Sequence, residues 1–151
     1  MDRIDTAILS TLQQDGQISM ARLSEIVGLS LSACHRRVKI LEAEGKILSY
    51  AARLDAKAVG LEIQVFIEVK LTSQRQEDLK AFESALTRMP EILECHFISG
   101  DADYLMRVAA RSTSEYERLY RERLSQLPAV SQMKTLLCLS AVKEFQGYHL
   151  D

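Results

Sequence analysis

The second half of the chain contains an internal repeat, and this repeat constrains the fold more than any other feature. The pattern L-x-x-[ML]-P-x-[IV] begins at Leu86 and again at Leu124, 38 positions later. In each copy it predicts a helix that ends before the proline, followed by a strand. Each copy is also preceded by residues that alternate between apolar and polar, from 63 to 71 and from 104 to 110. Such alternation is typical of a half-buried strand.

These segments together predict the order βαββαβ, which forms a ferredoxin-like sandwich with both helices on one face of the sheet. Two sequences predict capping boxes at the helix starts, Ser73-x-x-Gln76 and Ser112-x-x-Glu115. The other face of the sheet has no cover within the chain, although Phe66 points to it. An open face with aromatic content indicates pairing with a second copy.

In the first half, residues 20–39 predict two short helices around a tight turn. Apolar residues recur at helical spacing as far as Val27, and Gly28 then breaks the pattern. Ser30 stands where the N-cap of the next helix belongs. That helix has one apolar face, formed by Leu31, Cys34, Val38 and Leu41.

The opposite face of this helix is basic and rich in hydroxyl groups. A glycine-containing turn between two helices, the second with such a face, fits the major groove of DNA. Serine and histidine can bond to base edges, while arginine and lysine reach phosphates or guanine. The alternative is a helical hairpin whose solvated face happens to be basic. The candidate DNA-binding residues are Ser30, Ser32, Ala33, His35, Arg36, Arg37 and Lys39.

The remaining patterns define the predicted domains. A further amphipathic helix precedes these two, and residues 47–54 contain enough β-formers for a short strand or wing. The predicted fold class is therefore α+β, with an N-terminal winged helix-turn-helix domain in residues 1–54. A hinge covers residues 55–61, and the ferredoxin-like βαββαβ sandwich covers residues 62–151.

The charge is distributed unevenly between these parts. The formal net charge is −2, but residues 1–60 carry eight basic and seven acidic side chains. The rest of the chain carries 11 basic and 14 acidic side chains. One weakly basic copy would contact few phosphates, and an oligomer would multiply those contacts. The charge pattern therefore favours a protein that binds double-stranded DNA as a dimer or larger assembly.

Composition indicates a cytoplasmic protein. Hydrophobic residues make up 47% and charged residues 26% of the chain, which is ordinary for a globular protein. No apolar run reaches the length of a membrane span, and the N-terminus lacks the layout of a signal peptide. The three cysteines, Cys34, Cys95 and Cys138, lie far apart within apolar patterns. We interpret them as buried thiols in a reducing compartment.

The chain resembles the Lrp/AsnC family (leucine-responsive regulatory protein and asparagine-synthetase regulator) of prokaryotic transcription factors over essentially its whole length. The matching segments, in order, are Asp2-Arg3-Ile4-Asp5, LSEIVGLS, Cys34-x-x-Arg37-Val38, LEAEGKI, Glu94-Cys95-His96, Ser99-Gly100-Asp101-x-Asp103-Tyr104, Leu-Pro-x-Val and Val142-Lys143. The resemblance implies a C-terminal domain that dimerises, often assembles dimers into larger rings, and senses an amino acid. The family often has proline and threonine where this chain has Leu31 and Ser32, so the operator sequence cannot be transferred.

An amino-acid site can also be argued from the loop 99–103. Gly100 allows positive φ, so backbone N–H groups can turn towards a carboxylate, and Asp101 or Asp103 can pair with an ammonium group. The alternative is a plain hairpin turn. Leucines of the last strand, in the same or a neighbouring copy, can form an apolar pocket wall or plain core. The candidate effector residues are Ser99, Gly100, Asp101, Asp103, Tyr104, Leu136 and Leu137.

The predicted function is a sequence-specific DNA-binding transcriptional regulator whose oligomeric C-terminal domain binds a small amino acid such as leucine or methionine. The expected partners are double-stranded DNA, the effector, and further copies in a homodimer, tetramer or octamer. We expect no cofactor, no metal and no enzymatic activity. Two alternatives remain: an enzyme similar to sirohaem decarboxylases, which share this two-domain layout, or a sensing oligomer whose DNA-binding domain is inert.

Overall fold

A computed structural model describes residues 1–150, so Asp151, the last residue of the predicted second domain, lies outside the described residues. The chain divides into two compact units. One contains Met1–Arg53 and the residues from Val142 onwards, and the other is Leu54–Ala141. The sequence pattern assigns the C-terminal residues to the second domain. In the structure they group with the first unit because their backbone bonds to Gln13 and Arg53.

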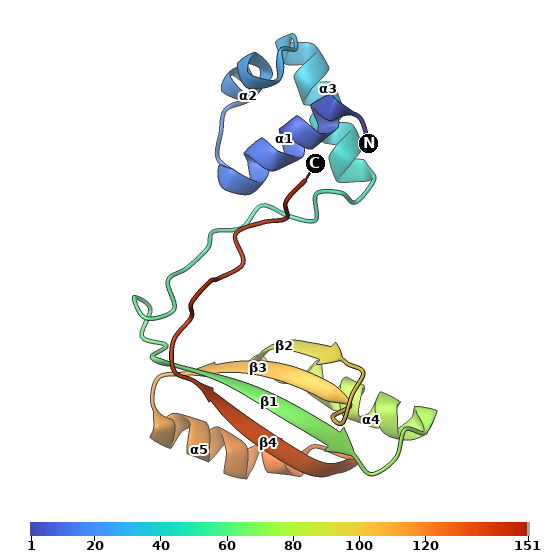
Figure 1. Cartoon of the computed structure of the whole chain (residues 1–151), viewed down its shortest axis with the longest axis vertical. Coiled ribbons are helices and arrows are strands. Elements are labelled where there is room, and N and C mark those ends of the chain that lie inside the picture. Colours follow the sequence, from blue (N-terminus) through green and yellow to red (C-terminus); the bar gives the residue numbers. More distant parts are fainter. Residues whose placement is uncertain (151) are drawn as a thin grey trace. The chain divides into compact units, whose positions relative to one another are not determined.

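The first unit is a bundle of α1 (Arg3–Gln14), α2 (Met20–Val27) and α3 (Leu31–Ala43) (Figure 1). Ser19 and Ser30 cap α2 and α3 with their side-chain oxygens, and Gly28 ends α2 at a φ of 68°, as the sequence predicts. The three helices bury a common core of Ile8, Leu12, Leu23, Cys34, Val38 and Leu41.

Two expectations for this unit are wrong. Leu31 was expected in the buried stripe of α3, but it is 54% exposed because the first turn of the helix extends past the core. The strand predicted at residues 47–54 does not form. A strand needs a hydrogen-bonded neighbour, and no other strand is described in this unit. Leu48 and Leu54 consequently remain 92% and 73% exposed.

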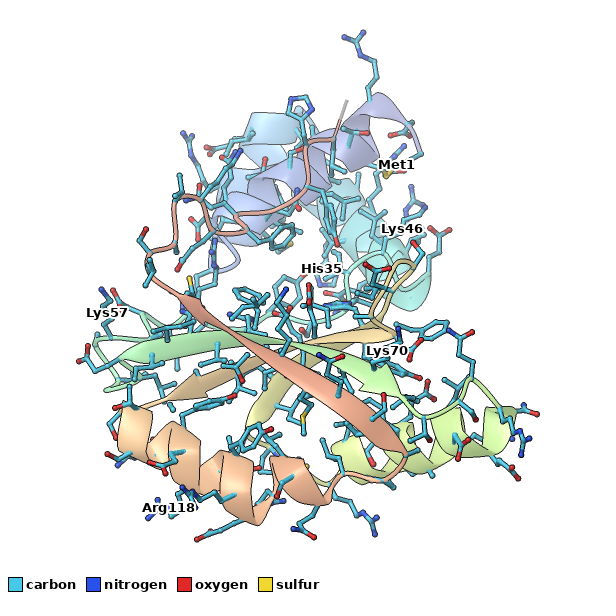
Figure 2. The ribbon with its side chains drawn as sticks, turned by 60° about the horizontal axis from the view of Figure 1, so that its bottom comes forward. Met1, His35, Lys46, Lys57, Lys70 and Arg118 are labelled. Atoms are coloured by element: carbon cyan, nitrogen blue, oxygen red, sulfur yellow. The ribbon has the colours of Figure 1, made fainter. Side chains whose placement is uncertain are left out.

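The second unit confirms the βαββαβ order and the ferredoxin-like sandwich. It comprises β1 (Ile63–Leu71), α4 (Gln76–Leu86), β2 (Ile92–Phe97), β3 (Tyr104–Ala110), α5 (Thr113–Glu122), a 3₁₀ turn (Leu124–Gln126) and β4 (Val130–Cys138). The strand order is β2-β3-β1-β4, with antiparallel neighbours throughout. Both helices cover the same face, as Figure 1 shows. In Figure 2, Arg118 projects from the side of α5 that faces away from the sheet.

The buried face of the sheet follows the predicted alternation. Val65, Ile67 and Val69 of β1 are at most 1% exposed and pack with Phe82 of α4. On the other face, Phe66 lies opposite Leu136 in the register of β1 with β4. Both of these side chains are partly exposed, and neither helix of the unit covers them. The open face with aromatic content that the sequence predicts is therefore present.

The two predicted capping boxes differ in outcome. Ser112 caps α5 by accepting a hydrogen bond from the N–H of Glu115, as predicted. At α4 the prediction is wrong, because Arg75 occupies the N-cap position and makes no side-chain cap. The hydroxyl of Ser73 instead bonds to the carboxylate of Asp78, in the first turn of α4.

Candidate nucleic-acid interface and effector loop

The exposed side of α3 carries polar and basic side chains from one turn to the next. Ser30 begins the helix by accepting a hydrogen bond from the N–H of Ala33 at 3.3 Å. Its hydroxyl also lies 3.4 Å from that of Ser32. Ser32, His35 and Arg36 are all exposed, whereas Ala33 is half-buried. The first two turns of α3 therefore present hydroxyl, imidazole and guanidinium groups together, which are donors and acceptors suited to base edges and phosphates.

Arg37 differs from the expectation that it faces DNA. Its Nη1 donates to Asp2 at 2.5 Å and to Asp5 at 2.7 Å, both in the first turn of α1. These hydrogen bonds raise the pKa of the Arg37 guanidinium. The pKa of Asp2 is lowered, first by the N–H of Asp5 that its carboxylate caps and then by Arg37. The Arg37 charge is thus neutralised by α1 and fixes α3 against it.

The remaining basic residues of this region differ in whether an acidic neighbour forms an ion pair with them. Lys39 forms an ion pair with Glu42 one turn later, at 2.7 Å. Lys46, which follows α3, pairs with Glu44 at 2.5 Å. Among residues 1–150, Arg36 is the base of α3 for which no ion pair or hydrogen bond is found. Arg36 is therefore the side chain of this helix best placed to contact a phosphate or a guanine.

The loop between β2 and β3 has the backbone that the sequence suggests. The N–H of Ile98 donates to the carbonyl of Asp103 at 2.9 Å and closes the turn. Gly100 has a φ of 125°, which favours glycine. Ser99, Gly100 and Asp101 are exposed, and in the described part of the chain their N–H groups have no protein partner. Exposed N–H groups beside a free carboxylate can bind the two charged groups of a zwitterion.

Asp103 does not lie on the exposed side of this loop. It is 6% exposed, and its carboxylate accepts from the N–H of Leu71 at 2.8 Å and from the amide of Gln74 at 2.7 Å. These two bonds lower the pKa of the Asp103 carboxyl, with the Leu71 N–H the larger cause. Both oxygens are therefore occupied, and Asp103 fixes the loop to the end of β1.

Tyr104 is likewise a core residue. Its ring centroid lies 4.7 Å from that of Phe82 and 5.1 Å from that of Phe97. Its hydroxyl donates to Glu83 of α4 at 2.7 Å. Burial, followed by this carboxylate, raises the pKa of Tyr104. The expectation that Tyr104 faces an effector therefore does not hold within one copy of the chain.

The leucines of β4 do not complete the loop site within one copy either. Leu136 lies opposite Phe66 and Leu137 opposite Val65, whereas Tyr104 pairs with Val69. The leucines thus stand at least three residues along β1 from the loop, a distance of about 10 Å at 3.3 Å per residue. Their side chains also point to opposite faces of the sheet. A site that contains the loop and either leucine therefore needs a second copy of the chain.

Sequence reasoning missed the partners of these residues. Asp2 and Asp5 belong to a motif that was recognised, but nothing local links them to Arg37, 35 and 32 positions away. Gln74 lies just before α4 and Glu83 lies within it. Both are again far along the chain from their partners, Asp103 and Tyr104. The sequence shows only that these segments contain hydrogen-bond donors and acceptors, and this does not identify which donor pairs with which acceptor.

The fold and these features define a helix-turn-helix protein with a C-terminal sensing sandwich. A winged helix-turn-helix DNA-binding family profile matches residues 1–47, and the Lrp/AsnC ligand-binding-domain profile matches residues 64–148. The chain belongs to the Lrp/AsnC family. It is a DNA-binding transcription regulator with a ligand-binding domain.

Relatives and solved structures agree with this placement. The chain is 39% identical over 144 residues to the proline dehydrogenase transcriptional activator of Rhizobium radiobacter, covering 95% of this chain and 92% of that protein. It is also 39% identical to the leucine-responsive regulatory protein of Escherichia coli K12, covering 95% and 88%. A transcriptional regulator of Neisseria meningitidis in complex with L-Met superposes with a TM-score of 0.94 at 30% identity, covering 100% and 97%. These relatives are named as regulators of transcription.

Proposed function

We propose that this protein recognises specific DNA sequences through the exposed side of α3 and that a small amino acid controls its binding. The observation that carries the first part is the cluster of Ser32, His35 and Arg36 on the first two turns of a capped helix. Phosphate contacts supply affinity, and base-edge contacts supply specificity. The test is selection of DNA from a random-sequence pool by the purified protein. A pool that shows no enrichment would overturn the proposal.

The proposed binding unit is a dimer formed through the open face of the sheet. Phe66, Leu105 and Leu136 contribute apolar side chains to this face. Arg107, directly opposite Phe66, forms an ion pair with Glu94 on the same face at 2.5 Å. A two-fold dimer presents two recognition helices, which suit half-sites one DNA turn apart, about 34 Å. Dimers assembling further into a tetramer or octamer remain part of the proposal.

Introducing a carboxylate into this face tests the dimer. Phe66→Glu is expected to shift sedimentation from dimer or larger to monomer, since a buried unpaired carboxylate is costly. Lys80→Glu, at an exposed position of α4, serves as the matched control and should leave the assembly unchanged. A Phe66→Glu protein that sediments like wild type would show that the open face is not the interface.

The proposed effector site lies at the loop 99–101. The free N–H groups of the loop suit the carboxylate of an amino acid, and Asp101 suits its ammonium group. Leu136 or Leu137 of a neighbouring copy, on opposite faces of β4, would contact an apolar side chain. Leucine and methionine are therefore the first candidates, in keeping with the L-Met complex of the Neisseria meningitidis relative. Asp103 and Tyr104 take the role of holding the loop in place.

Calorimetry tests this site. Titration with the twenty amino acids should identify a ligand whose binding is abolished by Gly100→Val or Asp101→Ala. Lys80→Ala, far from the loop along the chain, is the control. Binding of the same ligand by all three variants with wild-type affinity would place the pocket elsewhere.

We further propose that the protein has no enzymatic activity. The rival is an enzyme similar to sirohaem decarboxylases. The free guanidinium of Arg36 on a capped helix supports DNA binding over this rival. The absorbance spectrum of the purified protein, with and without added sirohaem, separates the two, because a bound tetrapyrrole absorbs visible light. Stoichiometric sirohaem binding would favour the enzyme.

A further inference from the structure

The chain passes between its two units twice. It leaves the helical unit after Arg53 and returns to it at Val142, as the C-terminal segment in Figure 1 shows. Only residues 139–141 separate the end of β4 from this return. Residues 142–150, here called the return segment, are therefore joined covalently to the end of β4 but held in the helical unit by noncovalent contacts.

The return segment is bound specifically to α1. The side-chain amide of Gln13 donates to the carbonyl of Tyr148 at 3.1 Å and accepts from the N–H of Tyr148 at 2.6 Å. One side chain thus satisfies both backbone groups of one residue, as a neighbouring strand would. The guanidinium of Arg53 donates to the carbonyl of Phe145. The outgoing and returning parts of the chain are therefore tied together at the edge of the helical unit.

Gly147 makes this close approach possible. Its φ is 115°, a conformation that other residues rarely adopt. A Cβ at this position would lie 2.9 Å from Oε1 and 3.1 Å from Cδ of Gln13. Any larger residue would strain the backbone and also push the Gln13 amide away from Tyr148. The sequence thus contains a glycine where docking of the segment requires one.

We propose that the surface of α1 around Gln13 is a docking site for the chain's own return segment, which acts as a second tether on the DNA-binding unit. This inference rests on the proposed DNA binding. Without the return segment the two units are joined by residues 54–62 alone, in which a hydrogen-bonded turn runs from Asp55 to Leu61. A second connection restricts motion of the helical unit about this single segment before DNA is bound, so two half-sites can be engaged with less loss of entropy. The tether consequently determines how strongly the DNA affinity depends on the spacing between two half-sites.

The experiment uses DNA selected by the wild-type protein from a random pool. Affinities are measured for one half-site, for two half-sites at the selected spacing, and for spacings changed by two base pairs. The variants are Gln13→Ala, Gly147→Val and a chain that ends at residue 141. Gln17→Ala is the matched control, because Gln17 is an exposed glutamine just after α1 and does not line the hollow that Gln13 and Gln14 form with the return segment.

Releasing the tether should weaken binding to two half-sites by roughly tenfold, flatten the dependence on spacing and leave the single half-site unchanged. Gln17→Ala should match wild type in all three. Unchanged spacing preference in Gln13→Ala and in the shortened chain would overturn the inference. An equal loss on the single half-site would also overturn it, since the segment would then only stabilise the helical unit. If the wild-type protein selects no DNA, the proposed function itself fails.

Discussion

Helix α3 and the loop between β2 and β3, the two proposed sites, place their polar residues in opposite environments. On α3, Ser32, His35 and Arg36 are exposed, as helical spacing predicts. In the loop between β2 and β3, Asp103 and Tyr104 turn inward and bond to groups of β1 and α4. Helical spacing reports the direction of a side chain directly. The direction of a loop residue depends on partners far along the chain, and the donor for Asp103 lies 32 positions earlier.

The largest effect is expected from Asp103→Ala. It should lower the free energy of unfolding of the ligand-binding unit by about 2–3 kcal/mol, because the buried N–H of Leu71 and the amide of Gln74 lose their acceptor. Urea unfolding measures this change. Asp101→Ala, at an exposed position of the same loop, should stay within about 0.5 kcal/mol of wild type. A stable Asp103→Ala protein that has lost only effector binding would show that this carboxylate serves the ligand.

The Asp103 contacts also predict the response to acid. Because the folded-state pKa of this carboxyl is lowered below its ordinary value of 3.8, its stabilising contribution is present above that value. It is lost as the pH falls through the lowered folded-state pKa. Asp103→Asn should therefore lose less stability than wild type between pH 5 and pH 2, a window of about three units that begins above the ordinary pKa of 3.8 and extends below it. Identical acid-unfolding curves would contradict the assigned contacts.

The same contrast explains what the sequence could and could not predict. The strand order and the α2–α3 turn follow from local signals, namely alternation, Ser30 as a cap and Gly28 as a break. The strand expected at residues 47–54 does not form, because these residues favour β structure but have no partner strand. The contacts of Asp103 with Leu71 and Gln74 could not be predicted, because an aspartate suits both a ligand and a structural acceptor. Only the fold decides between these roles.

The next effect concerns Arg36. Arg36→Ala should weaken binding to selected DNA by about tenfold and lower the slope of log affinity against log salt by about one unit if the side chain contacts a phosphate. If it reads a base edge instead, the loss of about 1–3 kcal/mol should be confined to sequences with the preferred base. Fluorescence anisotropy at several salt concentrations distinguishes these outcomes. A variant with wild-type affinity and slope would remove Arg36 from the interface.

Arg37 provides the matched case on the same helix. Arg37→Ala should leave the salt slope unchanged but lower the free energy of unfolding of the helical unit, because its contacts with Asp2 and Asp5 hold α1 against α3. Arg22→Ala is the control, since its pair with Glu25 is solvent-exposed and should contribute little. A reduced salt slope with unchanged stability would show that Arg37 contacts DNA.

The smallest effect is expected at Ala129. This residue has a φ of 61°, which is unfavourable for a residue with a Cβ. Its carbonyl accepts from the N–H of Thr72 at 2.7 Å and so holds the turn in this conformation. Ala129→Gly should raise the thermal stability of the ligand-binding unit by about 0.5–1 kcal/mol. Gly100→Ala, at a φ of 125° in the effector loop, should change stability in the opposite direction.

The central claim is that the exposed side of α3 reads bases in the major groove, and methylation protection tests it most directly. Dimethyl sulfate modifies guanine N7 in the major groove and adenine N3 in the minor groove, so it reports which groove is covered. With selected DNA, the wild-type protein should protect guanine N7 in two patches about 10 base pairs apart. Arg36→Ala, with Ser32→Ala beside it, should weaken this protection. Protection of adenine N3 alone, or N7 protection that neither variant changes, would contradict the account.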